Sequence, residues 1–160
     1  MDKAIVVYFS ATGVTKGVAE RLAKAIGAEL YEIKPAQAYT AADLNWQDKQ
    51  SRSSVEMADR ASRPAIAGDL PSLAPYARVY VGFPIWWYRE PSIVDTFVEK
   101  CAAALAGKVV VPFATSGGSG MGDSSANLQK LAPQARVVAG KRFDAAVSAA
   151  ALSAWAQSVK

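Results

Sequence analysis

Short apolar runs rich in β-branched residues alternate with helical patterns along most of this chain. Residues 4–9 (AIVVYF) form such a run, which is typical of a central parallel strand buried on both faces of a sheet. Residues 14–26 then place apolar side chains on one helical face and end at Gly27, which predicts an amphipathic helix. Because strands that alternate with helices pair in parallel through crossover connections, the pattern predicts a doubly wound α/β domain.

The same alternation continues to the C-terminus. Further strands are expected at residues 29–33, 78–83, 108–113 and 135–139, and helices at residues 92–105, 124–131 and shortly before Lys160. The expected fold is a three-layer α/β sandwich, in which helices cover both faces of a five-stranded parallel sheet. A chain of 160 residues has the length of one domain, and it contains no internal repeat or linker, so residues 1–160 are predicted to form a single domain.

Residues 35–75 break this rhythm. The segment is longer than an ordinary connection needs, and it contains Trp46, a polar helical pattern at residues 48–61 and a proline-rich end. We expect it to supply the second crossover helix together with an additional covering loop.

The residue types that are absent exclude several kinds of chemistry. The sequence has no histidine and one cysteine, so the usual zinc, haem and iron–sulfur ligand sets cannot be assembled and no metal site is expected. Catalytic triads that need a histidine base are excluded as well. Cys101 lies among alanine and valine in an expected helix, and we interpret it as a packing residue. Redox chemistry would therefore need an organic cofactor.

Charge and hydropathy limit the kinds of partner that this protein is expected to bind. The net charge is +4, but the 18 basic residues are scattered, and Lys141 and Arg142 are the only adjacent pair, which argues against nucleic acid as a partner. The apolar runs are far shorter than the roughly 20 residues that span a bilayer, so no membrane span is expected. The N-terminus does not resemble a signal peptide, and a cytoplasmic location is predicted.

Ligands of an open parallel sheet bind outside the carboxyl ends of the strands, where the strand order reverses. After the first strand, residues 10–15 (SATGVT) place three hydroxyls and a glycine at a helix start, where backbone N–H groups and the helix dipole can bind an anion. An ordinary serine–threonine helix cap is the alternative. The loop lacks the glycines of a Walker loop, and the chain has no GxGxxG, so a phosphomonoester is favoured over ATP or NAD.

The loops after the third and fourth strands are also unusual. Residues 84–91 carry three consecutive aromatic side chains, which can stack on a flat cofactor, although core or dimer packing would also explain them. The next residue, Arg89, is solvated or ion-paired in the ordinary case. Residues 115–122 are rich in glycine, so their main-chain groups can approach a ligand closely; a flexible linker is the alternative.

Together, the three loops resemble the motifs of the flavodoxin family. They stand in this sequence as residues 8–15 (YFSATGVT), 82–87 (GFPIWW) and 113–120 (FATSGGSG), in the family's order and over nearly the whole chain. The resemblance implies a flavodoxin-like fold with strand order 2-1-3-4-5. It also implies non-covalently bound FMN at the switch between the first and third strands.

The resemblance also implies which residues would contact FMN, by their positions in the motifs. The phosphate would be held by Ser10, Thr12, Gly13, Val14 and Thr15. The isoalloxazine ring would lie along Pro84, Ile85, Trp86 and Trp87, with Thr115, Ser116, Gly117, Gly118 and Gly120 lining its far side. No side chain is an evident proton donor, so no catalytic residue is assigned.

Two features depart from the family pattern. Tyr88 and Arg89 follow the two tryptophans where many relatives have glycine, and the isoelectric point near 9.2 differs from that of the acidic electron-carrying flavodoxins. Three functions therefore remain open. The chain is an electron carrier that serves a redox partner protein or a small-molecule acceptor, an NAD(P)H-dependent quinone reductase in which Arg89 stabilises reduced FMN, or a non-catalytic flavin-binding regulatory module.

Overall fold

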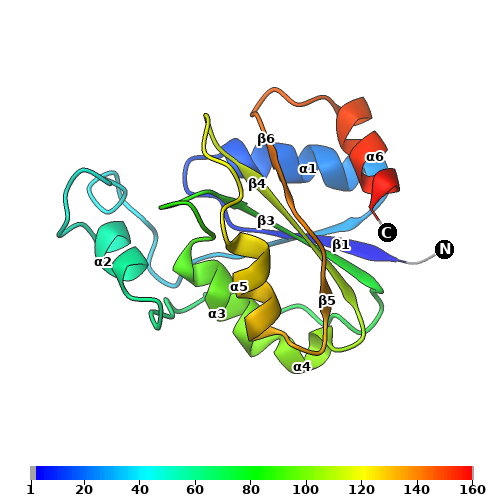
Figure 1. Ribbon diagram of the computed structural model, residues 1–160, viewed down its shortest axis with the longest axis horizontal. Helices are drawn as coiled ribbons and strands as arrows, with labels where there is room; N and C mark the ends of the chain where they lie inside the picture. Colours follow the sequence, from blue (N-terminus) through cyan, green and yellow to red (C-terminus); the bar gives the residue numbers. More distant parts are fainter. Residues whose placement is uncertain (1–2, 160) are drawn as a thin grey trace.

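A central sheet with helices on both faces forms the body of the computed structural model, which describes residues 3–159 (Figure 1). The strands are β1 (Ala4–Tyr8), β2 (Glu29–Glu32), β3 (Arg78–Pro84), β4 (Val109–Thr115), β5 (Arg136–Val137) and β6 (Lys141–Phe143). The helices are α1 (Val14–Ile26), α2 (Arg52–Ala58), α3 (Ser92–Lys100), α4 (Ala102–Leu105), α5 (Ser124–Leu131) and α6 (Ala149–Ser158). The strands pair in parallel in the order β2-β1-β3-β4-β5, which confirms the three-layer α/β fold and the expected strand order.

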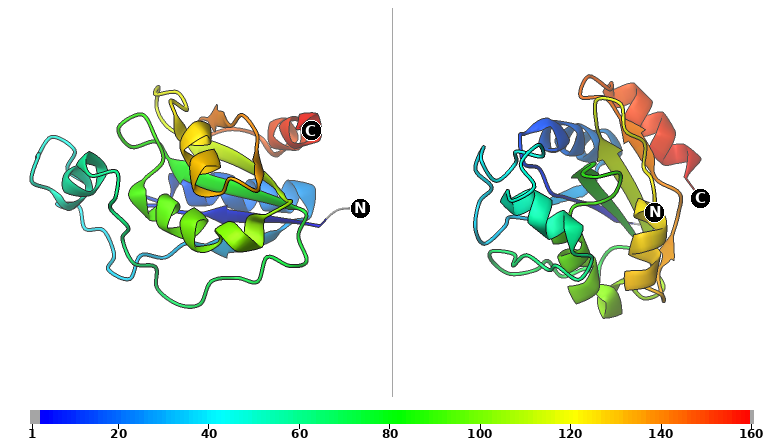
Figure 2. Two further views of the ribbon diagram at one scale, coloured as in Figure 1. Left: turned by 60° about the horizontal axis from the view of Figure 1, so that its bottom comes forward. Right: turned by 60° about the vertical axis from the view of Figure 1, so that its left-hand side comes forward.

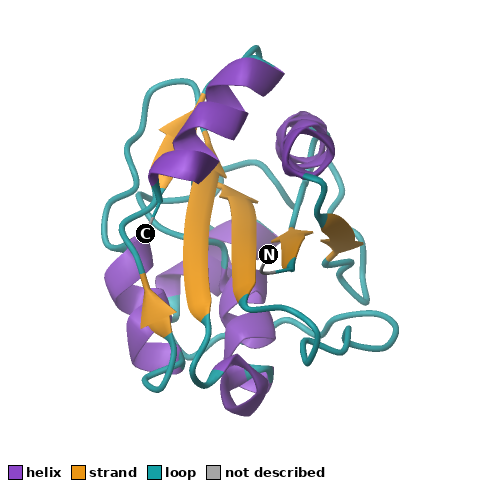
Figure 3. Ribbon diagram, turned by 90° about the vertical axis from the view of Figure 1, so that its right-hand side faces the viewer, coloured by secondary structure: helices purple, strands orange, loops and turns teal. Residues whose placement is uncertain are grey.

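Two hydrophobic cores lie on opposite faces of the sheet. Helices α1 and α6 cover one face, and α3, α4 and α5 cover the other (Figures 2 and 3). Successive side chains of a strand point to opposite faces. Val6 and Tyr8 therefore enter the core under α1 and α6, while Ile5 and Val7 enter the core under α3 and α5. This two-sided burial explains why β1 is a continuous apolar run.

The edge of the sheet differs from the expected fifth strand at residues 135–139. Two short strands take its place: β5 pairs with the start of β4, and β6 pairs in parallel with its end. On this edge, the carbonyl of Val110 accepts a hydrogen bond from the N–H of Val138. The backbone nitrogen and carbonyl of Pro112, two residues further along β4, point toward the same edge of the sheet. Because proline has no N–H to donate, the ladder is interrupted beside Pro112, and the edge strand is divided there.

The helix expected at residues 92–105 is divided at Cys101 into α3 and α4. The helical hydrogen bonds from Cys101 N–H to Phe97 and from Leu105 N–H to Cys101 persist across the division. Cys101 is buried, and burial raises the pKa of its thiol to about 11. Its environment is that of a packing residue, in agreement with the sequence interpretation.

The segment of residues 35–75 departs most from expectation. The helix expected at residues 48–61 is the short α2, which lies beyond the carboxyl ends of the strands and does not cover a face of the sheet (Figures 1 and 2). Extended chain after α2 supplies the cover instead: Leu73 is buried in the core under α3, with Ile66 and Leu70 packed against it. The polar residues of α2 could not have formed a helix buried on the sheet.

Gly82 in β3 provides a test of this packing, because a Cβ at this position would overlap the buried Phe113 ring of β4. We predict that Gly82→Ala lowers the free energy of unfolding by about 1–3 kcal/mol, as overpacking does in close-packed cores. Gly17→Ala is the matched control, since a Cβ at Gly17 in α1 meets nothing within 4 Å. It should raise stability by about 0.5–1 kcal/mol through helix propensity. Urea unfolding measures both, and a Gly82→Ala variant as stable as the wild type would contradict the packing.

Candidate functional site

The loops that follow β1, β3 and β4 meet at the carboxyl edge of the sheet and border an open cavity of about 520 Å³, which we call the loop cavity. Its lining residues are Thr12, Val14, Pro84, Ile85, Trp86, Thr115, Ser116, Gly117, Ser119, Asp144 and Ala145. Each of the three loops singled out in the sequence thus contributes to one cavity. A volume of this size is in the range of about 300–1,000 Å³ that is usual for small-molecule sites.

The loop after β1 presents free backbone donors at the start of α1. The Ser10 hydroxyl accepts hydrogen bonds from the N–H groups of Gly13 and Lys16, both at 3.1 Å, so this side chain performs the capping role. Gly13 adopts a left-handed conformation with φ of 95°. No hydrogen-bond partner for the N–H of Val14 or Thr15 lies among the described residues. These groups stand at the positive end of the helix dipole and are suited to bind an anion.

Two hydrogen bonds hold the three loops together. The buried hydroxyls of Thr15 and Thr115 are 2.7 Å apart, which ties the first loop to the end of β4. The carbonyl oxygen of Thr115 accepts from the N–H of Ile85 at 3.1 Å, which ties the end of β4 to the loop after β3. Thr115 is therefore bonded to both neighbouring loops, and Thr15 fixes the cavity without lining it.

The loop after β3 forms a tight hairpin turn. Trp86 and Arg89 exchange two backbone hydrogen bonds of 3.0 and 3.1 Å, and the intervening Trp87 and Tyr88 have φ angles of 49° and 62°. Two consecutive positive φ angles are the signature of a type I′ turn, which usually takes asparagine and glycine. Gly122 packs closely against this turn, because a Cβ on it would overlap the Tyr88 carbonyl. The turn therefore holds two large aromatic residues in a rarely occupied conformation.

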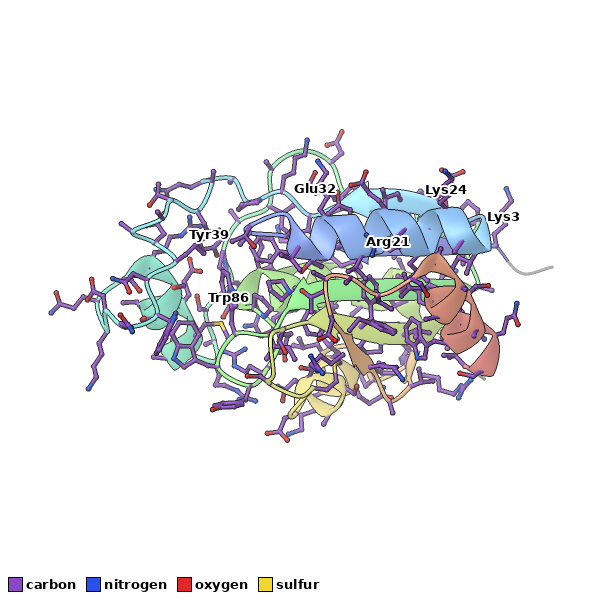
Figure 4. All side chains as sticks on the ribbon, turned by 90° about the horizontal axis from the view of Figure 1, so that it is seen from above. Lys3, Arg21, Lys24, Glu32, Tyr39 and Trp86 are labelled. Atoms are coloured by element: carbon purple, nitrogen blue, oxygen red, sulfur yellow. The ribbon has the colours of Figure 1, made fainter. Side chains whose placement is uncertain are left out.

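The Trp86 ring is fixed by aromatic neighbours from two other elements. Its centroid lies 5.5 Å from that of Phe9 and 5.4 Å from that of Tyr39, both in edge-to-face geometry, and Figure 4 shows Tyr39 beside Trp86. The Tyr39 hydroxyl donates to a Glu56 oxygen at 2.5 Å, and the Arg52 guanidinium lies 3.9 Å from the Tyr39 ring centroid. Burial and the bond to Glu56 raise the pKa of Tyr39. Tyr39 thus ties the long segment of residues 35–75 to the cavity wall.

The loop after β4 is braced by the edge strand. Arg142 in β6 donates to the Ser116 carbonyl and to the Asp144 carboxylate, both at 2.9 Å. Asp144 and Ala145 line the loop cavity, although the sequence analysis did not select them. The signal was the proline in β4, which divides the edge strand and brings the carboxyl end of β6 to the same edge.

Six of the residues selected from the sequence do not line the loop cavity. They are Ser10, Gly13, Thr15, Trp87, Gly118 and Gly120. Ser10, Gly13 and Thr15 shape the first loop, and Gly118 donates its N–H to the Ser116 hydroxyl at 3.3 Å within the third loop. Trp87 faces a neighbouring cavity.

The family model described as flavodoxin matches residues 3–159. The chain belongs to the flavodoxin family. Candidate flavoproteins from Bacteroides eggerthii (46% identity, 100% of both chains, TM-score 0.91) and Bacteroides uniformis (46%, 98% of both chains, TM-score 0.89) are similar over nearly their whole length. A Lactobacillus acidophilus flavoprotein solved in complex with FMN is 22% identical with a TM-score of 0.74, over 89% of this chain and 93% of that one, and it shares the fold. No curated protein matches the chain.

Residues 3–159 contain no group of histidine, cysteine and acidic side chains that could hold a metal ion. Among the same residues, no helix has the length and apolar character needed to cross a bilayer.

Arg89 lies behind the hairpin turn and not in the loop cavity. It is buried, its guanidinium is 3.3 Å from an Asp95 oxygen and 3.6 Å from a Glu90 oxygen, and it donates to the Met57 carbonyl at 3.1 Å. The structure therefore shows the ion-paired alternative. The expectation that Arg89 stabilises reduced FMN is not supported, because Arg89 does not line the loop cavity and its guanidinium is paired with buried carboxyl groups.

One cation between two buried carboxyl groups leaves an excess of negative charge. Burial, a hydrogen bond that protonated Asp95 donates to Glu90, and the Glu90 charge raise the pKa of Asp95 to about 9, against the opposing effects of Arg89 and Arg63. The Asp95 Oδ1 atom has no hydrogen-bond partner in the described part of the chain. The pair thus keeps one proton at neutral pH.

This proton makes stability depend on pH. The folded protein retains it up to about pH 9 while the unfolded chain loses it near pH 4, so the contribution is complete below pH 4 and is lost as the pH rises. We predict that Asp95→Asn flattens the fall in unfolding free energy between about pH 5 and pH 8, where the wild type loses at most about 1.4 kcal/mol per pH unit. The control is Asp144→Asn, whose side chain is 73% exposed. Equal pH slopes in urea unfolding of Asp95→Asn and wild type would contradict the assignment.

Proposed function

We propose that this protein binds FMN non-covalently in the loop cavity and uses it to exchange electrons with a redox partner. The observation that carries the proposal is the meeting of free N–H donors, an aromatic wall and a glycine-rich loop at one cavity of about 520 Å³. FMN supplies the redox chemistry when bound, and the protein supplies binding, orientation and access.

The residues of the cavity fit the parts of FMN. The unpaired N–H groups of Val14 and Thr15 suit the phosphate, and Thr12 adds a hydroxyl at the same wall. The planar ring of Trp86 and the apolar side chain of Ile85 suit the ring system. The main chain of Ser116 and Gly117 can meet the polar edge of the ring with directional hydrogen bonds.

The charge of the protein bears on its partner. Arg142 compensates the Asp144 carboxylate at the cavity wall, and the net charge is +4, so the overall charge does not favour association with a basic redox protein. A second cavity without charged lining adjoins the loop cavity among the described residues, which favours a small uncharged electron acceptor. An FMN-dependent quinone reductase is therefore the second candidate function.

Kinetics separate the candidates. FMN-loaded protein that couples NADPH oxidation to quinone reduction with multiple turnovers would support the reductase. Reduction by dithionite in separate one-electron steps, without NADPH oxidation, would support the carrier. Bound FMN that neither NADPH nor a protein reductase reduces would indicate a non-catalytic module and contradict a redox role.

Val14→Asp tests the phosphate site, because Val14 is 42% exposed at the start of α1 and lines the cavity. A carboxylate here repels the phosphate by about 1–4 kcal/mol, so we predict a dissociation constant for FMN that is at least about fivefold higher. Riboflavin, which lacks the phosphate, should bind with nearly unchanged affinity. Because an acidic residue in the first turn of a helix interacts favourably with the helix dipole, the free energy of unfolding should stay the same or rise by about 0.3–1 kcal/mol.

The matched control is Val55→Asp in α2, since Val55 is 56% exposed and outside the loop cavity. This variant should bind both flavins as the wild type does in equilibrium fluorescence titrations. A Val14→Asp variant that loses FMN and riboflavin equally, or neither, would show that the phosphate lies elsewhere. A wild-type protein that takes up no FMN would contradict the proposed function itself.

A further inference from the structure

A second cavity of about 480 Å³ adjoins the loop cavity, and the two share Ile85, Trp86 and Ser119. The remaining lining residues are Leu44, Trp46, Ser53, Trp87 and Tyr88. We call it the aromatic cavity. Each of the two cavities is large enough for its own small-molecule ligand. FMN in the loop cavity would therefore leave the aromatic cavity to a second molecule.

The outer wall of the aromatic cavity comes from the long segment of residues 35–75, which carries Leu44, Trp46 and α2. Contacts with the body of the protein fix this segment in place. Arg89 donates to the Met57 carbonyl at the end of α2, and the Ser92 hydroxyl donates to the Glu56 carbonyl at 3.3 Å. The cavity is therefore bounded by anchored chain at the end of the molecule where α2 lies (Figure 1).

The rings of the aromatic cavity are left in contact with water. Trp46 is 69% exposed, Trp87 is 42% exposed and Tyr88 is 73% exposed. A group of large aromatic side chains on one surface indicates a binding site more often than it is simply exposed to solvent without a function. A flat ligand stacked among them would remove this apolar area from water.

The polar groups of the aromatic cavity define the kind of ligand. No charged side chain lines it among the described residues, so an anionic dinucleotide would bring its phosphates to a wall without a cation. The hydroxyl of Ser53, a residue only 1% exposed, has no hydrogen-bond partner in the part of the chain that the structure describes. A buried hydroxyl without a partner is costly, and a ligand oxygen that accepts from it would remove that cost.

We propose that the aromatic cavity binds a flat, uncharged aromatic molecule with a carbonyl oxygen at its edge, which accepts a hydrogen bond from Ser53. The proposal rests on the proposed function, because it assigns the loop cavity to FMN. The Trp86 side chain belongs to both cavities, so the second ligand lies next to the flavin site. The lining of the aromatic cavity therefore favours an uncharged aromatic carbonyl compound as the small molecule that binds next to FMN.

Two probes of similar shape test this proposal on the FMN-loaded protein: chromone, which has a ring carbonyl, and naphthalene, which has none. Isothermal titration should show one chromone bound per FMN-loaded chain. Ser53→Ala should weaken chromone binding about 3–10-fold and leave naphthalene binding unchanged, since one hydrogen bond is lost. Trp46→Ala should weaken both probes about 3–10-fold through the loss of ring contact.

Control measurements separate a binding defect from a folding defect. Val55→Ala, on the exposed side of α2 outside the cavity lining, should bind both probes as the wild type does. Ser53→Ala should unfold at the same urea concentration as the wild type or a higher one, because its hydroxyl has no partner to lose. The dissociation constant for FMN should be the same in all variants.

Three results would overturn the proposal. A titration of FMN-loaded wild type in which chromone does not bind would show that the cavity takes no such ligand. Unchanged chromone affinity in Ser53→Ala would remove the assigned hydrogen bond. A tenfold loss of FMN affinity in Trp46→Ala would show that the aromatic cavity holds the flavin ring itself. A wild type without FMN would instead contradict the proposed function.

Discussion

Parallel pairing of β1, β3 and β4 is the constraint on which the rest of the structure depends. Parallel strands that are adjacent in a sheet end at the same edge, so the three chain segments that leave these strands must start side by side. Helices on both faces bury the strands between them. The site therefore arises where the chain leaves the sheet, and its polar groups are free to face a ligand because the sheet itself is held by packing.

The three loops are fixed at this edge by a small number of directional contacts. Thr115 is bonded to Thr15 on one side and to Ile85 on the other, so the end of β4 sets the spacing of the loops. Trp86 is held by edge-to-face contacts with neighbouring rings. The turn that follows it, between Trp86 and the buried Arg89, is strained because its two central residues have positive φ angles. Rigid placement of an aromatic wall before any ligand arrives lowers the entropic cost of binding.

Periodic patterns in the sequence predicted the alternating strands and helices of a parallel sheet, and therefore the convergence of the loops at its carboxyl edge. The strand order was predicted from the resemblance to flavodoxins, because alternation and burial do not by themselves say which strands are neighbours. The prediction of a crossover helix at residues 48–61 was wrong, because a polar helical pattern alone does not say which surface the helix covers. The contact of Tyr39 with Trp86 and the burial of Arg89 depend on the hairpin turn at residues 87–88, whose positive φ angles no local sequence rule anticipates for two aromatic residues. Pro112 did carry a readable signal, since a proline in a central strand predicts a break at its neighbour.

If one ligand site joins the loops after β1, β3 and β4, all three loops must respond to the same ligand. Titration of the FMN-free protein with FMN, followed by the backbone amide resonances in ¹H–¹⁵N correlation spectra, tests it most directly. We expect the largest shifts on the amides of Val14, Thr15, Trp86, Ser116 and Gly117, and we expect them to saturate together at one FMN per chain. Shifts confined to a single loop, or centred on residues away from this edge of the sheet, would contradict it.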